Sequence, residues 1–169
     1  MHNILFAMLM LSAFVCGGKN DTSSNKENIK YQETVVTSPG VKPNQVLLPL
    51  PESMLWVFGR NSSRYDPNED DITAAEEILQ TCFSKESSGT RNPFFGRKLE
   101  NYHRQFAGVI LENGDKVIWI NCFCYVDNEY FRRWKEQFVM VDGGGNCFFN
   151  VKVNLNTKQY YELMVNGNI

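Results

Sequence analysis

The sequence predicts an α+β fold in which one main helix packs on a curved antiparallel sheet of four to six strands. Two observations support this prediction: a single amphipathic helix, and a later series of apolar segments joined by short turns. An amphipathic helix cannot bury its apolar face alone, and a sheet with one apolar side can receive it. The chain has 169 residues, of which 43% are hydrophobic, and this is enough for one domain with a core.

The one clear helix is predicted near the middle of the chain. Asp70 and Asp71 suit its N-cap region, and Thr73 and Glu76 also fit a capping box, so the start stays open by two or three residues. The Ser-Ser-Gly sequence at 87–89 predicts its end. Apolar residues recur at the spacing of one helical face, which we expect to be buried: Ile72, Ala75, Ile78, Leu79, Cys82 and Phe83.

Extended segments dominate after Pro93. Asn113-Gly114 separates the runs 102–111 and 116–125, and Asn-Gly between two such runs is a strong hairpin signal. Segment 127–136 is predicted to form a short helix or a turn. Three more strands are predicted after it and one before the helix: 138–141, 147–155, 159–165 and 54–58.

This order of elements resembles the helix-grip arrangement of cystatin-like and NTF2-like folds. The resemblance implies only the layout of a helix across a curved sheet, because a shared fold does not carry a function with it. The stretches "GDKVIWINCFC" and "VDGGGNCFFNVKVNLNTKQYYELMVNG" look like those of small bacterial lipoproteins and secreted proteins. That resemblance covers about the last seventy residues and implies no activity or site.

The N-terminus resembles an export signal. Ile4 to Val15 is a run of twelve uncharged, mostly apolar residues, which matches a signal-peptide core and is too short to span a bilayer. The run ends at Cys16, which resembles the lipobox cysteine of bacterial lipoproteins and would then carry the lipid. Val15 and Ala13 depart from the usual lipobox residues. Lipidation of Cys16, ordinary cleavage near Gly17 and a buried N-terminal element all stay open.

Three parts of the chain follow from this interpretation. Residues 1–16 are expected to be a signal peptide ending at the lipobox-like cysteine, residues 17–44 a flexible tether, and residues 45–169 a single α+β globular domain. The first segment of that domain cannot be a central strand, because Pro49 and Pro51 lack the N–H that a strand donates to its neighbour. The expected location is the cell envelope, at the outer membrane or cell surface, with a periplasmic or secreted protein as the alternative.

Four cysteines remain in the predicted domain, and we expect all of them to face one core: Cys82, Cys122, Cys124 and Cys147. Buried thiols and a disulfide, for example from Cys82 to a strand cysteine, are both open interpretations. A zinc site is disfavoured because Cys-Phe-Cys leaves only one residue between two ligands. A catalytic thiol is disfavoured because these positions look apolar.

Two features are candidates for a binding surface. The first is a loop with two adjacent aromatic residues between two arginines: Arg91, Phe94, Phe95 and Arg97. One of the two rings is expected to be exposed, and exposed aromatic residues beside arginine are typical of binding surfaces. The second is a stripe along one strand with Trp119, Phe123 and Tyr125, which needs a cover from segment 127–136, including Trp134, or from a partner.

Other motifs are weaker. Asp66, Asn68, Asp70 and Glu77 match an EF-hand loop in part, but Asp71 stands where the turn needs glycine, so we predict no metal site. His103 is interpreted as a solvated strand residue. The glycine-rich run 142–146 is interpreted as a hairpin loop rather than a phosphate-binding loop.

The expected function is a non-catalytic binding or structural role in the cell envelope. The partners are the membrane, through the N-terminal lipid, and a protein; the net charge of −2 gives no general attraction to nucleic acid, and no cofactor is expected. An inhibitor of a secreted hydrolase is one alternative, weakened because Gln105–Gly108 lies inside a predicted strand. A thiol-dependent enzyme using Cys124 or Cys147 with His103 is the other.

Overall fold

The structure is a computed structural model that describes residues 41–59, 61–124, 126 and 129–167. The predicted signal peptide, Cys16 and most of the predicted tether lie outside these residues, as does Tyr125. The elements are, in chain order, β1 (Gln45–Leu47), η1 (Glu52–Phe58), β2 (Ser63–Tyr65), α1 (Glu69–Ser87), η2 (Leu99–Asn101), β3 (His103–Ile110), β4 (Lys116–Phe123), η3 (Glu129–Phe131), η4 (Gly145–Cys147), β5 (Phe148–Asn154) and β6 (Gln159–Val165). The η elements are short 3₁₀ helices.

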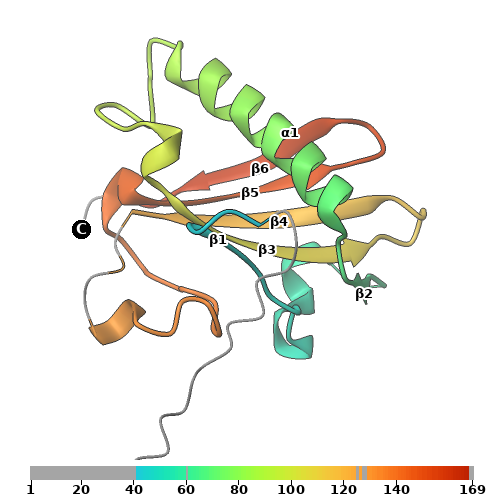
Figure 1. Cartoon of the computed structure of the whole chain (residues 1–169). Coiled ribbons are helices and arrows are strands. Elements are labelled where there is room, and N and C mark those ends of the chain that lie inside the picture. The colour runs from blue at the N-terminus through green and yellow to red at the C-terminus, as the bar shows by residue number, and fades with distance from the viewer. Residues whose placement is uncertain (1–40, 60, 125, 127–128, 168–169) are drawn as a thin grey trace, which may run out of the picture. The chain divides into compact units, whose positions relative to one another are not determined.

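The strands form one six-stranded sheet in the order β1-β3-β4-β5-β6, with β2 also paired to β3. Among the described strands, β1 alone runs parallel to its neighbour, and all other pairs are antiparallel. The 19-residue helix α1 packs across one face of this sheet (Figure 1). The predicted α+β class, with one main helix on a mostly antiparallel sheet, is therefore confirmed.

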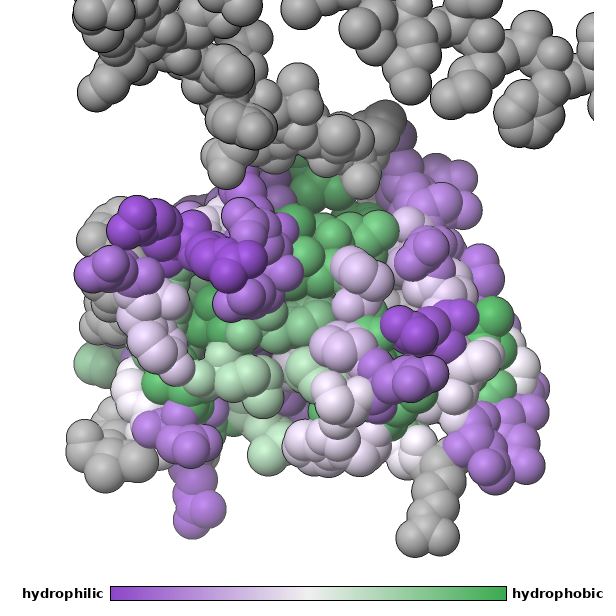
Figure 2. Space-filling model, turned by 90° about the horizontal axis from the view of Figure 1, so that it is seen from below, coloured by the Kyte–Doolittle hydropathy of each residue, from purple (hydrophilic) through white to green (hydrophobic). Residues whose placement is uncertain are grey.

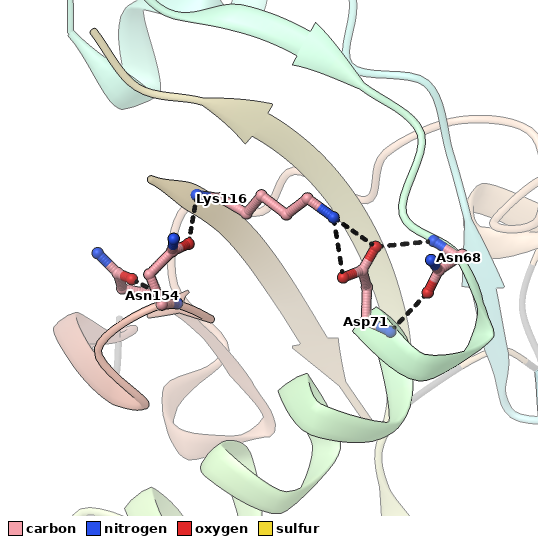
Figure 3. Close-up of polar contacts among 5 residues, drawn as sticks. Asn68, Asp71, Lys116 and Asn154 are labelled. Atoms are coloured by element: carbon pink, nitrogen blue, oxygen red, sulfur yellow. Dashed lines mark hydrogen bonds and ion pairs between the residues drawn. The ribbon is translucent and has the colours of Figure 1, made fainter. Parts of the chain in front are cut away.

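The start of the helix is set by a capping box. Asn68 is the N-cap: its side chain accepts from the Asp71 N–H at 2.9 Å, and the Asp71 carboxylate accepts from the Asn68 N–H at 3.1 Å. Lys116, the first residue of β4, places its Nζ 3.3 Å from that carboxylate and ties the helix start to the sheet (Figure 3). Asn68 of the partial EF-hand motif, and the Asp71 that departs from the motif, thus form the helix cap. All six residues predicted to form the apolar face are buried.

Two predicted strands are wrong. Segment 54–58 forms η1 instead, because the Met54 N–H donates to the Pro51 carbonyl and starts a tight turn. Because this run is apolar at every position, it has no hydrophobic period that could distinguish a strand from a helix. Segment 138–141 forms no strand, because the N–H and the carbonyl of Val139 are both bonded to side chains rather than to a neighbouring strand.

The sheet is covered on both faces. The helix side holds the largest apolar cluster, which includes Leu79, Phe83, Phe94, Phe106 and Phe149. On the opposite face, which we call the underside, η1 packs over Trp119, and residues 129–141, which we call the cover segment, pack over Phe123 (Figure 1). This double cover explains why β3 and β4 are buried along nearly their whole length.

The underside remains rich in apolar surface even with its cover. Figure 2 views the molecule from below and shows apolar residues gathered in the middle of this face, between polar margins. Trp56 of η1 and Tyr130 of the cover segment are strongly exposed.

Candidate functional site

A disulfide joins the two ends of the loop that covers the underside. In the β4–β5 pair, Phe123 lies opposite Phe148. Cys124 and Cys147 are the next residues outward; their Cα atoms are 5.2 Å apart, and the Cys124 N–H donates to the Cys147 carbonyl at 3.1 Å. Residues facing each other at this spacing satisfy disulfide geometry. The bond therefore closes a loop that contains the whole cover segment.

Two buried amide side chains hold the middle of the cover segment. Gln105 and Asn121 are cross-strand partners, and the Asn121 Nδ2 donates to the Gln105 Oε1 at 3.0 Å. The same Oε1 accepts from the Val139 N–H at 2.9 Å, and the Asn121 Nδ2 donates to the Val139 carbonyl at 2.7 Å. The Gln105 Nε2 donates to the carbonyls of Trp134 and Gln137. The role of neither amide was identified from the sequence. The signal that could have indicated it is a polar residue within an otherwise apolar strand.

Trp119 faces the underside, away from the helix, but it offers no surface to a partner, which corrects its choice as a candidate binding residue. It is only 2% exposed, because η1 and the cover segment lie over it. Its ring centroid is 5.4 Å from that of Phe138, and its Nε1 donates to the Asn150 Oδ1 at 3.1 Å. Trp134 packs on Phe123. The cover therefore comes from the chain itself, from two separate segments.

Cys82 and Cys122 are free thiols buried in the cluster under α1, so the example pairing of Cys82 with a strand cysteine is not formed. Cys147 lies in the underside cluster instead, which corrects the expectation that all four cysteines face one core. Burial raises the pKa of Cys82 to about 12, and burial also raises the pKa of Cys122 far above its usual range. Both groups are therefore protonated at neutral pH, the weakly nucleophilic form.

The predicted aromatic loop separates its two rings. Phe94 is 1% exposed and stacks on Phe83 of α1, with ring centroids 4.3 Å apart. Phe95 is 82% exposed. Arg91 is also exposed, and Arg97 is half-buried. The loop connects the end of α1 to η2 (Figure 1), and it presents one aromatic ring to solvent beside two cations.

The backbone of this loop is firmly held. The Asn92 side chain accepts from the Phe94 N–H at 2.8 Å, and the Arg97 N–H donates to the Phe94 carbonyl at 2.9 Å. Asn146, at the end of the glycine-rich run, donates its Nδ2 to the Phe95 carbonyl at 3.0 Å and accepts from the Arg97 Nε at 3.2 Å. This role of Asn146 was not identified from the sequence, because the glycine-rich run by itself predicts only a turn.

The cover segment borders two open cavities on the underside. One of about 280 Å³ is lined on one side by residues Leu48, Pro49, Pro51 and Met54 and on the other by Glu136–Phe138 and Met140. The other, of about 220 Å³, is lined by Tyr130, Trp134 and the same stretch from Gln137 to Met140. Apolar cavities with a few polar groups are the usual form of binding sites, and the first of these two cavities has that form.

His103 belongs to the aromatic cluster under the cover segment rather than to open surface. Its ring centroid lies 5.8 Å from that of Phe123 and 5.0 Å from that of Trp134, and the residue is half-buried. Within the described ranges, no cluster of three or more His, Cys, Asp or Glu residues has the arrangement to hold a metal ion. Of the helices in those ranges, none combines the length and the apolar character that crossing a membrane requires.

Comparison of the chain with protein-family models, with curated protein sequences and with solved structures finds no match.

Proposed function

We propose that this protein is an exported, lipid-anchored protein of the cell envelope with a binding role and no catalytic one. The observation that carries the proposal is the Cys124–Cys147 disulfide. Disulfides persist in oxidising compartments outside the cytoplasm. The bond is therefore compatible with the interpretation of residues 1–16 as an export signal ending at the lipid-bearing Cys16.

The binding role is supported by what the molecule presents to solvent. Phe95 projects from a loop whose backbone is held by several hydrogen bonds. The underside presents Trp56 and also Tyr130, which lines one of the two cavities. Aromatic side chains and arginine are enriched at binding surfaces. The thiol-enzyme alternative loses support, because Cys124 and Cys147 bond to each other.

The inhibitor alternative gains no support either. The segment that the cystatin analogy would need, Gln105–Gly108, is buried inside β3, with β4 on one side and β1 and β2 on the other. It therefore cannot enter the active site of a hydrolase without unfolding the sheet.

Mass spectrometry of the protein isolated from native envelopes, with alkylation before and after denaturation, tests the proposal. We expect an N-terminal Cys16 that carries lipid and a Cys124–Cys147 linked peptide. We expect Cys82 and Cys122 to be alkylated only after denaturation, since both are buried thiols. A chain that still begins at Met1 and has all of its cysteines reduced would contradict export. A free Cys124 or Cys147 that is rapidly alkylated in the native protein would instead revive the thiol-enzyme alternative.

A further inference from the structure

We propose that residues 91–98, which we call the aromatic loop, form a second membrane contact in which Phe95 enters the interface of an anionic lipid surface and Arg91 and Lys98 lie against its head groups. The inference builds on the proposed function, because the lipid at Cys16 would hold the domain near that surface. It adds an orientation: the end of the domain that carries the aromatic loop faces the membrane.

The first support is the enforced exposure of Phe95. Phe94 occupies the core position against Phe83, so the neighbouring ring is directed outward. Gly96 has a φ of 76°, which lets the chain turn back directly after the exposed ring. Asn146 holds the Phe95 carbonyl from a different part of the chain. The loop thus holds an apolar ring in water, and moving that ring into an apolar environment is favourable.

The second support is the separation of charge. The stretch 87–99 carries Arg91, Arg97 and Lys98 and no Asp or Glu, although the whole chain has a net charge of −2. Arg91 and Lys98, on either side of Phe95, are both exposed. Aromatic rings favour the membrane–water interface, and cations near an anionic surface favour association by about fivefold each.

A lipid surface suits this loop better than a protein does. Protein hot spots lie in groups of apolar contacts, whereas the other strongly exposed apolar side chains of the described residues belong to other elements: Trp56, Tyr130, Met140 and Met164. A single ring between cations combines the two features that favour a membrane interface, an aromatic side chain and positive charge. Because a tethered domain has a high effective concentration at the surface, a weak contact of this kind is sufficient.

The test places an indole at the tip of the loop. The Phe95→Trp variant, purified with its mature N-terminus, is reconstituted in vesicles of phosphatidylcholine and phosphatidylglycerol with brominated acyl chains, and compared with the wild-type protein. We expect blue-shifted emission and added quenching from the indole at position 95. The matched control is Tyr130→Trp, because Tyr130 is 75% exposed but lies on the cover segment; its indole should stay in water.

Two further arms test the charge. Replacing Arg91 and Lys98 with Gln in the Phe95→Trp background should weaken binding of the loop to the anionic vesicles about fivefold per cation. Binding should also weaken on vesicles of phosphatidylcholine alone, which lack the anionic lipid. Position 95 is exposed, so these variants keep the fold, which circular dichroism verifies.

An indole at position 95 that remains in water on anionic vesicles overturns the inference, as does equal quenching at position 130. Emission that shifts on intact envelopes but not on vesicles points to a protein partner and also overturns it. The mass of the N-terminus reports the lipid on Cys16 separately. A lipidated protein whose indole stays in water would therefore contradict this inference and leave the proposed function intact. Quenching in a protein without the lipid would support the membrane contact and contradict the lipid anchor.

Discussion

At the scale of single residues, Gln105 and Asn121 do for the cover segment what a neighbouring strand would do. Each carries a flat amide with donors and an acceptor, and the pair bonds both polar backbone groups of Val139. Gln105 is completely buried, so each of these bonds replaces one to water. An irregular segment can therefore pass over the sheet without leaving its backbone unsatisfied.

Replacing Gln105 with Met removes this anchor while nearly preserving side-chain volume. It leaves the Val139 N–H and the carbonyls of Trp134 and Gln137 without the partner they have in the native protein. We expect the free energy of unfolding to fall by about 2–4 kcal/mol, as is typical when buried polar groups lose their bonds. Urea denaturation measures the change. The control is Gln159→Met on the exposed end of β6, and an equal loss there would contradict the assigned role.

Lys158 and Glu162 both have left-handed backbone conformations, and replacing each of them with glycine should change the stability of the protein in opposite directions. Lys158, at a φ of 56°, is an exposed turn residue, and Lys158→Gly should stabilise the protein by about 0.5–1 kcal/mol by removing strain. Glu162, at a φ of 48°, pairs with the buried Lys152, whose Nζ also donates to the Val57 carbonyl of η1. Glu162→Gly should therefore destabilise by about 1–3 kcal/mol despite the same relief. Thermal denaturation of both variants would contradict this account if their shifts had the same sign.

At the scale of elements, the disulfide follows from the register of β4 and β5. Once Phe123 lies opposite Phe148, Cys124 and Cys147 must face each other. The sequence could not select this pair, because the strands are joined by a long segment rather than by a short turn whose type sets the register. The Asn113-Gly114 turn, by contrast, joins β3 and β4 directly, and that hairpin was predicted and is confirmed.

Removing the disulfide should act mainly on the cover segment. The cross-link spans a sequence separation of 23 residues, and a loop of that size contributes roughly 3 kcal/mol to stability. We expect the Cys124→Ala, Cys147→Ala double variant to lose about this amount in urea denaturation. The matched control, Cys82→Ala with Cys122→Ala, keeps the disulfide and should remain sensitive to reductant. If the first variant were as stable as the wild-type protein, the closed loop would not contribute to stability.

The elements that could be predicted are those with a period or a defined turn. The apolar face of α1 repeats at helical spacing, and β6 was predicted with the bounds it has, because its segment is extended and bounded by a turn. What could not be predicted depends on contacts distant in the sequence. Burial of Trp119 required knowing that residues near 50 and near 138 meet over it. Of the aromatic loop, one exposed ring was predicted, but the hydrogen bond from Asn146 depends on the tertiary fold.

At the scale of the whole molecule, the two faces of the sheet are covered in different ways. One face is covered by a continuous 19-residue helix whose backbone satisfies itself. The underside is covered by η1 and the cover segment, which attach through side chains: Gln105, Asn121, Lys152 and the disulfide. Such attachments can open locally without disrupting the ladder of β3, β4 and β5.

Native-state hydrogen exchange should therefore separate the two covers. We expect amides at the centre of the sheet, such as those of Val109 and Ile120, to exchange only on global unfolding, since they lie in fully buried ladders. Amides of η1 and the cover segment should exchange through openings that cost at least about 2 kcal/mol less. Reducing the disulfide should lower protection of the cover segment further and leave η1 unchanged, because η1 lies outside the closed loop. A single exchange free energy for every amide, before and after reduction, would show that both covers open only together with the sheet.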